Sequence, residues 1–326
     1  MFGGKSFNPD TDIPDLSGKV ILVTGGNTGL GKETVLQMAK HKPLQIFLAA
    51  RTPSKAEEAI AEIRAAVPSA NLTFLPLDLT SLESVAKAAT NFKAQSDRLD
   101  ILFNNAGIMA VPPGTTKDGY EVQFGTNHVG HALLIKLLLP TLLETAKRPQ
   151  ADVRIVNLSS AGNALAPWKG IDFDDLALSK SGTWARYGQS KLANILYTDE
   201  LAKKFPDITS ASIHPGLIHT NVSTNVHSMA LYDVKLTWLD AQLYTSNKES
   251  NAIVRYGLMV AGGLMMSDVP TGAKNQLWAA VSKDVVSGTY YTPIGVKGLR
   301  TPAAKSGPLA AQLWNWTEEE LAKHGY

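Results

Sequence analysis

The chain has 326 residues, of which 44% are hydrophobic and 18% are charged, as in an ordinary globular protein with a sizeable core. Its 31 basic and 29 acidic residues leave a net charge of +2, so composition gives no argument for nucleic acid or an anionic membrane surface as a partner. The absence of cysteine excludes disulfides, thiolate catalysis and cysteine-ligated metal sites, and the seven histidines show no metal-ligand spacing.

The N-terminal region lacks the features of a targeting segment. Residues 1–19 contain no apolar stretch of signal-peptide length. The most apolar run of the chain, from Ala132 to Leu143, is too short to span a bilayer. We therefore predict a cytoplasmic protein without a membrane span, which agrees with its lack of cysteine.

Short apolar strands alternate with longer helical segments along the first two thirds of the chain. Strands are predicted at 19–24, 44–50, 72–77, 99–104, 153–159 and 208–214, and helices at 29–41, 53–67, 81–95, 119–147 and 184–205. This alternation is typical of βαβ units and predicts a single doubly wound α/β domain, with a parallel sheet flanked by helices on both faces. We expect the domain to span residues 1–326, with a polar insertion at 217–248 and a C-terminal tail at 301–326.

A glycine-rich turn, TGGNTGLG, follows the first predicted strand. Its spacing is G-x-x-x-G-x-G rather than the G-x-G-x-x-G of most dinucleotide-binding Rossmann folds, and a turn without a ligand is the alternative interpretation. Glycines let the backbone approach a bulky anion, and the N-terminus of the next helix offers free N–H groups to a pyrophosphate. Because the turn lies between a strand and a helix, we predict a dinucleotide-phosphate site formed by Thr24, Gly25, Asn27, Thr28, Gly29, Leu30 and Gly31.

The end of the second predicted strand indicates which dinucleotide binds. A carboxylate at this position suits the ribose 2′-hydroxyl of NAD, whereas an arginine suits the 2′-phosphate of NADP. The strand ends at Arg51, and no acidic residue lies between Leu44 and Ser54. Arg51 can pair with a phosphate dianion through two hydrogen bonds, assisted by Thr52, Ser54 or Lys55. We therefore predict NADP(H) rather than NAD(H), the alternative being a solvated arginine at a strand end.

Tyr187 and Lys191, in YGQSK, are four residues apart and therefore lie on one face of a predicted helix. A free tyrosine has a pKa of about 10, and a nearby ammonium favours the phenolate and lowers that pKa. Tyr187 can then give a proton to a carbonyl oxygen or take one from an alcohol. Taken alone, however, a tyrosine and a lysine at this spacing are more often a surface pair.

Four motifs, NNAG, NLSS, YGQSK and HPG, follow successive predicted strands, at the sheet edge where open α/β folds bind ligands. Together with TGGNTGLG they resemble the short-chain dehydrogenase/reductase family over about residues 17–220. The segments LAAR, FGTNHVGH and YGQSKLANILY are most similar to its retinol-dehydrogenase-like branch. The resemblance implies a single NAD(P)-binding Rossmann domain and an oxidoreductase that moves a hydride between NADP(H) and a carbonyl compound or alcohol.

The resemblance also implies a catalytic set of Asn127, Ser160, Tyr187 and Lys191. In the family, the serine holds the substrate oxygen, the lysine also holds the nicotinamide ribose, and the asparagine holds a water that links the lysine to solvent. Ser159 remains the alternative serine, because a shift of one residue at a strand end reverses the side-chain direction. An ordinary capping or core role remains the alternative for Asn127.

Further cofactor contacts are implied by the same resemblance. Asp78 matches an acid that contacts the adenine, although it can instead cap the following helix. Asn104 and Gly107 either let the chain pass beside the adenosine ribose or stabilise the sheet edge, and Thr220 is either a cofactor contact or an ordinary loop hydroxyl. Beyond the glycine turn, the implied cofactor-binding residues are Arg51, Lys55, Asp78, Leu79, Asn105, Ala106, Gly107, Tyr187, Lys191, Pro215, Gly216 and Thr220.

Aromatic and apolar residues are frequent in two segments near this edge. Trp168, Phe173 and Trp184 precede Tyr187, and the 217–248 insertion carries Met229, Leu231, Tyr232, Trp238, Leu239 and Tyr244. Such loops indicate an apolar, fairly large substrate, unless these residues pack the insertion onto the domain. We predict an NADP(H)-dependent oxidoreductase that interconverts a lipophilic ketone or aldehyde and its alcohol. The alternatives are a cofactor-binding regulatory protein and a non-redox cyclase or isomerase on the same fold.

The assembly of the protein is less well specified by its sequence. The predicted helix at 119–147 is apolar on much of its circumference, which is consistent with a homodimer or homotetramer. The tail, with Trp314 and Trp316, either closes over the pocket or binds a neighbouring subunit. The partner that the sequence indicates is thus a small lipophilic molecule, together with a second copy of the chain, rather than a nucleic acid.

Overall fold

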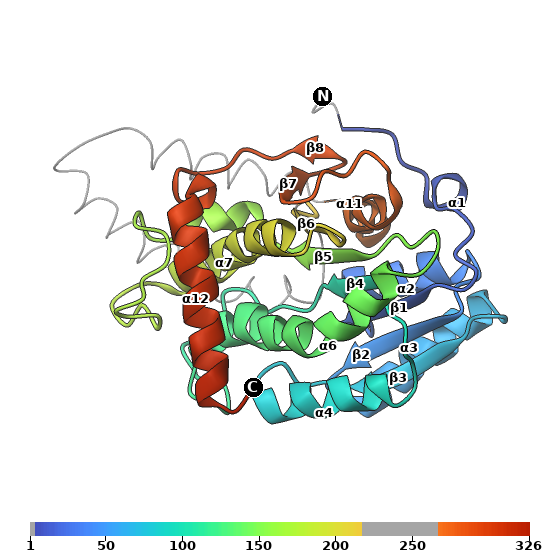
Figure 1. The fold of residues 1–326 in the computed structure, drawn as a ribbon, viewed down its shortest axis with the longest axis horizontal. Helices are drawn as coiled ribbons and strands as arrows, with labels where there is room; N and C mark the ends of the chain where they lie inside the picture. The colour runs from blue at the N-terminus through green and yellow to red at the C-terminus, as the bar shows by residue number, and fades with distance from the viewer. Residues whose placement is uncertain (1–3, 217–266) are drawn as a thin grey trace.

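An eight-stranded sheet forms the centre of the computed structural model, which describes residues 4–216 and 267–326 (Figure 1). The strand order is β3-β2-β1-β4-β5-β6-β7-β8. Neighbouring strands run parallel except for β8, which is antiparallel to β7. The strands are β1 Val20–Thr24, β2 Gln45–Ala50, β3 Leu72–Pro76, β4 Ile101–Asn104, β5 Arg154–Leu158, β6 Thr209–Ile213, β7 Thr289–Thr292 and β8 Val296–Lys297.

Helices cover both faces of this sheet, which confirms the predicted doubly wound α/β fold (Figure 1). Side chains alternate along each strand, so Val20 and Leu22 enter one buried cluster while Ile21 and Val23 enter the other. The strand order reverses between β1 and β4, and open α/β sheets bind ligands at such a point. The covering helices are α2 Gly29–Ala39, α3 Pro53–Ala66 and α11 Val269–Val281 on one face, and α4 Leu82–Lys93, α6 Gly130–Ala146 and α7 Thr183–Lys204 on the other.

Each predicted strand and helix has a counterpart, and the largest difference concerns the helix predicted at 119–147. Gly119 has a φ of +88°, in the left-handed region, so the helix does not include it. The carboxylate of Glu121 accepts the N–H of Phe124 at 2.7 Å and caps the helix, which starts at Val122. A π-helical turn, Gly125–Val129, then separates the short α5, Val122–Phe124, from α6.

In the part of the chain that the structure describes, one helical stretch, Val122–Ala146, is long and apolar enough to cross a membrane. More than half of its most apolar window is buried inside the protein. Leu133, Leu134 and Leu138 are fully buried and pack in the core beside the sheet. The apolar character of this stretch is therefore explained by its place in the fold.

The last quarter of the chain holds elements that the sequence pattern did not predict, namely α11, β7, β8 and a C-terminal helix, α12 Gly307–Lys323. Figure 1 shows α12 lying across α7. Trp314 stacks on Tyr197 of α7, with ring centroids 4.8 Å apart, and Trp316 meets Phe124 edge-on at 5.8 Å. The tail predicted at 301–326 thus packs on helices of its own chain. The insertion predicted at 217–248 lies outside the described residues.

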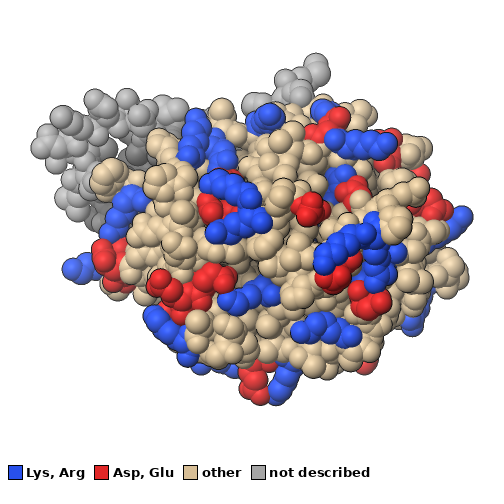
Figure 2. Space-filling model, in the orientation of Figure 1, with Lys and Arg blue, Asp and Glu red and all other residues tan. Residues whose placement is uncertain are grey.

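Charged side chains are distributed evenly over the face shown in Figure 2. Lysine and arginine lie interspersed with aspartate and glutamate there, as the net charge of +2 suggests. Some charged residues of the protein pair within one helix, such as Lys87 with Glu83 and Lys147 with Glu144. Such exposed pairs contribute little to stability.

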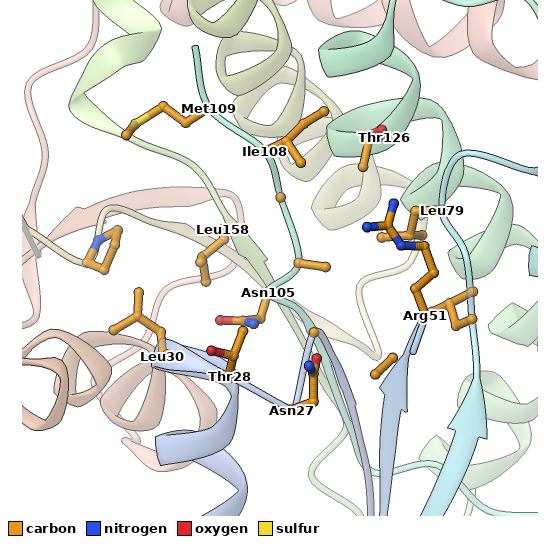
Figure 3. A pocket seen from close by; sticks show the side chains of 18 of the residues that line it. Asn27, Thr28, Leu30, Arg51, Leu79, Asn105, Ile108, Met109, Thr126 and Leu158 are labelled. Atoms are coloured by element: carbon orange, nitrogen blue, oxygen red, sulfur yellow. The ribbon is translucent and has the colours of Figure 1, made fainter. Parts of the chain in front are cut away.

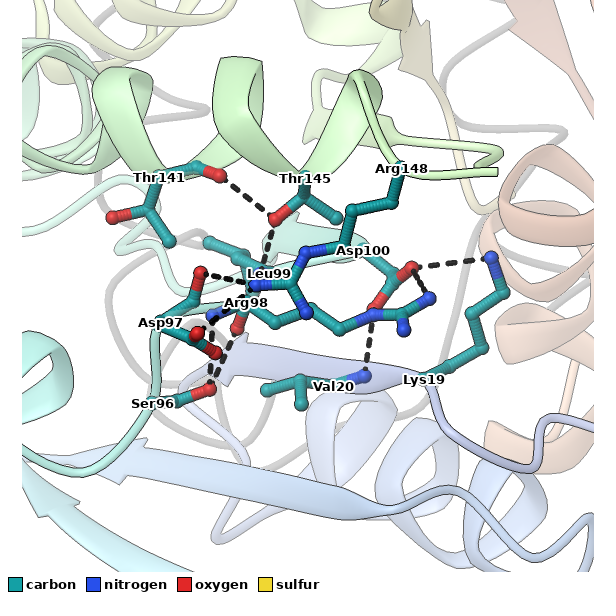
Figure 4. Close-up of polar contacts among 10 residues, drawn as sticks. All are labelled: Lys19, Val20, Ser96, Asp97, Arg98, Leu99, Asp100, Thr141, Thr145 and Arg148. Atoms are coloured by element: carbon teal, nitrogen blue, oxygen red, sulfur yellow. Dashed lines mark hydrogen bonds and ion pairs between the residues drawn. The ribbon is translucent and has the colours of Figure 1, made fainter. Parts of the chain in front are cut away.

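A buried carboxylate, Asp100, joins the N-terminal ends of β1 and β4 (Figure 4). It accepts the backbone N–H of Val20 at 2.9 Å and two hydrogen bonds from Arg98, at 2.7 and 2.8 Å. The Lys19 ammonium lies 3.1 Å from the same carboxylate. The Asp100 side chain is fully buried, whereas both cations are partly exposed. Because Asp100 directly precedes β4 and its carboxylate binds the first residue of β1, it links the starts of the two paired strands.

Replacing Asp100 by alanine should lower the free energy of unfolding by about 3 kcal/mol, because the Val20 N–H and two cations lose a buried partner. Urea denaturation followed by circular dichroism measures this loss. Asp97→Ala is the matched control, since the Asp97 side chain is 91% exposed in its ion pair with Arg148 and its removal should cost much less. Equal losses for the two variants would contradict the role given to Asp100.

Candidate functional site

A cleft of about 550 Å³ opens at the carboxyl ends of β1, β2, β4, β5 and β6. Figure 3 shows Asn27 and Thr28 on one side of it and Met109 on the other. Every predicted cofactor contact lines this cleft except two: Thr24 is buried, and Thr220 lies outside the described residues. The structure therefore gathers at one place residues that are up to about 190 positions apart in the chain.

The glycine turn brings the start of α2 to the floor of the cleft. Gly25 has a φ of +65°, and a Cβ on Gly31 would overlap the Gly25 carbonyl oxygen. The two segments are thus closer together than a side chain permits. Thr28, the N-cap of the 11-residue α2, makes no side-chain capping bond. The first N–H groups of this helix therefore remain available to an anion in the cleft, which fits the predicted pyrophosphate.

Thr24 ties the glycine turn to the segment after β4. Its Oγ1 accepts the N–H groups of Asn105 and Ala106, both at 3.0 Å, and Asn105 Nδ2 donates to the Thr24 carbonyl at 2.8 Å. Asn104 is buried and donates to Asn157 Oδ1 at 2.8 Å inside the sheet. Of the two roles considered for Asn104, the structure therefore shows the one that stabilises the sheet.

Next to the carboxyl end of β2, the cleft is lined by basic side chains and lies beside the N-terminus of α3. Arg51 follows the strand directly, and Figure 3 shows its side chain extending from the strand end. Lys55 lies in the first turn of α3 and also lines the cleft. The N-cap of α3, Thr52, makes no side-chain capping bond, so the N–H groups of the first turn that follow Pro53 are available as well. Two cations and a helix N-terminus suit a phosphate group.

Asp78 lines the cleft next to these groups. Its carboxylate accepts the N–H and the hydroxyl of Thr80, at 3.0 and 2.7 Å, and pairs with the Lys117 ammonium at 3.2 Å. Burial raises the pKa of Asp78, but the bonds from Thr80 and Lys117 together outweigh burial and leave the pKa below its usual value. The following helix is capped by Ser81, whose hydroxyl accepts the Ser84 N–H at 3.2 Å. The capping alternative for Asp78 is therefore wrong.

The two candidate serines after β5 point in different directions. Ser159 is buried and donates to the backbone carbonyl of Lys191 at 2.7 Å. Ser160 accepts the N–H of Gly162 at 3.0 Å, and its side chain lowers the pKa of Tyr187. A Cβ on Gly162 would lie 2.7 Å from the Tyr187 ring, so the residue there must be small. Of the two serines, Ser160 is the one that presents its hydroxyl beside the tyrosine.

Tyr187 and Lys191 both line the cleft from α7. Lys191 Nζ lies 5.8 Å from the centre of the Tyr187 ring and donates to the Leu158 carbonyl at 3.2 Å. Burial raises the pKa of Tyr187 to about 12, against a smaller lowering by Ser160, and burial lowers the pKa of Lys191 to about 8. The ammonium was expected to lower the pKa of Tyr187, but burial of the phenol raises that pKa instead, and the group that lowers it is Ser160.

Asn127 lies behind the cleft, in the π-helical turn. Its Oδ1 accepts the Ile108 N–H and its Nδ2 donates to the Ile108 carbonyl, each at 2.9 Å. Nδ2 also donates to Ser190 Oγ at 2.9 Å. A Cβ on Gly107 would lie 3.1 Å from Asn127 Oδ1 and 3.2 Å from Lys191 Nζ, so these groups are close neighbours. The Asn127 side chain thus holds the segment after β4 against α7.

Sequence reasoning missed an apolar part of the cleft. Ile108, Met109, Val122 and Leu158 line it, together with His214, whose pKa is lowered to about 4 by burial. Ile108 and Met109 directly follow NNAG, which was predicted to lie at a strand end in the cleft. They could therefore have been predicted to line the cleft as well. Val122 comes from the start of α5, and no pattern in the sequence marks it.

The aromatic residues before Tyr187 have three different places. Trp184 lies edge-on to Tyr187, with ring centroids 6.1 Å apart. Phe173 packs near Trp316 of α12 at 6.4 Å, and Trp168 is 96% exposed. Of these three, Trp184 alone is next to the candidate site. The aromatic residues predicted in the 217–248 insertion lie outside the described residues.

Comparison with known proteins places the chain in a family. Residues 19–172 match the family model of short chain dehydrogenases. The chain is 38% identical to the short-chain dehydrogenase/reductase drtF of Aspergillus calidoustus, over 95% of this chain and 96% of that protein. The chain belongs to the short-chain dehydrogenase/reductase family. This short-chain dehydrogenase/reductase is also 34% identical to retinol dehydrogenase 12 of Mus musculus, over 98% of its own length and 91% of that protein, which confirms the predicted branch.

Solved structures show the same fold. One from Mycobacterium paratuberculosis is 28% identical and covers 97% of both chains with a TM-score of 0.69. The NADPH-bound carbonyl reductase from chicken fatty liver is 23% identical and covers 87% of this chain and 100% of its own, with a TM-score of 0.59. Family membership makes the protein an oxidoreductase that uses a nicotinamide cofactor.

Gly31→Ala should weaken binding of a nicotinamide dinucleotide by roughly tenfold or more, because the added Cβ displaces Gly25 from the start of α2. Titration of the dinucleotide with tryptophan fluorescence as the readout measures the dissociation constant. Gly114→Ala is the control, since its nearest neighbour would lie 3.9 Å from the new Cβ. A folded Gly31→Ala variant with an unchanged dissociation constant would show that the phosphates bind elsewhere.

Proposed function

We propose that the protein is an NADP(H)-dependent oxidoreductase that interconverts a lipophilic ketone or aldehyde and its alcohol, with Ser160, Tyr187 and Lys191 as catalytic residues. One observation carries the proposal. Ser160 and Tyr187 lie on either side of Gly162, and both line the same cleft that the glycine turn enters. A proton-transfer group and a dinucleotide-phosphate turn in one cleft are what hydride transfer to a carbonyl requires.

The described residues fit a nicotinamide dinucleotide. The free N–H groups at the start of α2 suit its pyrophosphate, and the cleft of about 550 Å³ has the size of a cofactor site. Gly107, which lines the cleft without a side chain, leaves room next to the Lys191 ammonium. When bound, the cofactor supplies the hydride to a carbonyl carbon or accepts it from an alcohol.

Tyr187 moves the proton that the substrate oxygen gains or loses. Its raised pKa keeps the phenol protonated at neutral pH, so in the reductive direction it donates to the carbonyl oxygen. Ser160 orients the same oxygen with a second hydrogen bond. Lys191, with a pKa lowered to about 8, keeps most of its positive charge at neutral pH and stabilises the phenolate that forms.

Arg51 and Lys55 support NADP(H) over NAD(H). Both line the cleft beside the uncapped N-terminus of α3. A 2′-phosphate brings negative charge to this point, where two cations and a helix dipole favour it. A free ribose 2′-hydroxyl would instead call for a carboxylate acceptor, and no acidic residue lies between Leu44 and Ser54.

The apolar part of the cleft supports a lipophilic substrate. Ile108, Met109, Val122 and Leu158 give it a wall of aliphatic side chains. Sites with such walls and few polar groups bind apolar molecules and orient them through one or two hydrogen bonds. Retinol dehydrogenases 12 and 13 are relatives of the chain at 34% identity, and retinol in their names is an apolar alcohol.

Tyr187→Phe should reduce turnover by about 10²–10⁴ without weakening NADPH binding, because it removes the proton donor and keeps the ring. The loss of NADPH absorbance with a panel of ketones and aldehydes measures turnover. If the wild type binds NADPH and turns over no carbonyl compound, the protein is a cofactor-binding regulator instead. If it forms product without net consumption of NADPH, the chemistry is cyclisation or isomerisation.

The two serines serve as controls for each other in the same assay. Ser160→Ala should reduce turnover by about 10²–10³, because one hydrogen bond to the reacting oxygen is lost. Ser159→Ala removes a bond to the α7 backbone and should mainly lower stability. The reverse ranking of the two variants would assign the catalytic role to Ser159.

Arg51→Glu should raise the Michaelis constant for NADPH on the order of 10²-fold, because it replaces a charge-assisted hydrogen bond with repulsion. The Michaelis constant for NADH should change by much less, since NADH lacks the 2′-phosphate. Lys87→Glu, an exposed charge reversal on α4, is the control for general electrostatics. Equal effects of Arg51→Glu on both cofactors would contradict the assignment of NADP(H).

A further inference from the structure

Two buried histidines lie in FGTNHVGH, one and four residues after Asn127, and they have different hydrogen-bond partners. His128 Nε2 lies 3.1 Å from Thr317 Oγ1 on α12. His131 Nε2 lies 2.9 Å from Thr24 Oγ1, and its Nδ1 lies 3.1 Å from the Asn127 carbonyl oxygen. His131 therefore connects the π-helical turn with the strand end that precedes the glycine turn, whereas His128 connects it with the C-terminal helix.

The direction of each hydrogen bond follows from the partners. The Asn127 carbonyl can only accept, so Nδ1 of His131 carries the proton. Burial lowers the pKa of His131 to about 4, and the nearby Lys191 ammonium acts in the same direction, so the ring is neutral at neutral pH. Nε2 must then accept, so the Thr24 hydroxyl donates to it at 2.9 Å in preference to the Phe103 carbonyl, which is farther away at 3.3 Å.

This leaves the two lone pairs of Thr24 Oγ1 for the N–H groups of Asn105 and Ala106, which lie 3.0 Å away. The segment that these residues begin ends at Ile108, whose N–H and carbonyl are both bonded to the Asn127 side chain. Residues 105–108 are thus held at one end by Thr24 and at the other by Asn127. His131 is bonded to both of these residues.

We propose that His131 is a positioning residue, which joins Thr24 to Asn127 and so holds residues 105–108 at a fixed distance from the Lys191 ammonium. Gly107 lies in the middle of that segment, where its Cβ would be 3.2 Å from Lys191 Nζ. A shift of about 1 Å at a reacting group costs on the order of 10² in rate. The expected effect of His131 on turnover rests on the proposed function. Its expected effect on the position of residues 105–108 does not.

Variants of His131 separate its two bonds. In His131→Asn, the amide takes the place of Nδ1 and keeps the donor to Asn127, and in His131→Gln, the amide takes the place of Nε2 and keeps a partner for Thr24. His131→Phe keeps the ring shape and removes both bonds. His128→Phe is the matched control, because His128 is about as buried in the adjoining π-helical turn, and its partners Thr317 and Asn194 are not among the groups bonded to residues 105–108.

Backbone hydrogen exchange in the protein without cofactor tests the proposal directly. Losing a hydrogen bond of ordinary strength should speed exchange in peptides covering residues 104–109 by about five- to tenfold in His131→Phe, and by less than twofold in His128→Phe. Comparison at equal thermal stability removes the general effect of destabilisation. Equal exchange in the two variants would overturn the proposal. If His131→Phe does not fold, the same comparison is made between His131→Gln and His128→Gln.

Cofactor binding and turnover give a second readout. His131→Phe should raise the dissociation constant for NADPH by about tenfold and lower kcat further, whereas His128→Phe should leave both within about twofold. His131→Asn and His131→Gln should each recover part of the loss. If His131→Phe binds NADPH and turns over substrate as well as the wild type does, the proposal is overturned. If the wild type itself shows no turnover, the proposed function is contradicted, and the hydrogen-exchange result alone decides on the role of His131.

Discussion

The buried ammonium of Lys191 is the group on which the arrangement of the site depends. A charge that is removed from water must be compensated, and desolvation lowers the pKa of this lysine to about 8. The structure supplies the Leu158 carbonyl at 3.2 Å and the face of the Tyr187 ring at 5.8 Å. It also leaves Gly107 without a side chain where one would crowd the ammonium. The residues around Lys191 are therefore constrained by the need to compensate the charge of a buried ammonium and to leave space for it.

The π-helical turn at Gly125–Val129 has a physical consequence for this cation. A π turn widens the helix and changes the direction in which its residues point, and such turns often occur at functional sites. Here the turn places Asn127 where its amide reaches both Ile108 and Ser190. One side chain thereby connects the segment after β4 with α7, which carries Lys191 and Tyr187. The wall of the cleft and its proton-transfer groups are consequently parts of one hydrogen-bonded unit.

Most of the fold up to residue 214 could be predicted, because buried parallel strands are continuous apolar runs and amphipathic helices follow them. The cleft could be predicted for the same reason, since residues such as Gly25, Arg51 and Ser160 directly follow strands. What could not be predicted depends on burial and direction. The pKa of Tyr187 rises because the phenol is desolvated, and the sequence contains only its neighbour Lys191, not its exposure.

The C-terminal elements were missed for a different reason. In α12, the buried residues Ala310, Leu313, Thr317 and Leu321 recur at helical spacing, so a helix could have been predicted there. The surface on which α12 packs could not be predicted, because the spacing of apolar residues does not indicate which part of the molecule a helix contacts. The directions of the Ser159 and Ser160 hydroxyls could not be predicted either. Both residues follow the same strand, and they differ in the groups to which their hydroxyls are hydrogen-bonded.

The position of α12 changes how the apolar character of α6 is interpreted. An apolar helix surface indicates a subunit contact only where the chain itself leaves that surface uncovered. Trp314 covers Tyr197 of α7, and Glu318 pairs with Lys136 of α6 at 2.6 Å. Part of the surface on which a helix-mediated dimer was predicted is therefore occupied by the C-terminal helix of the same chain.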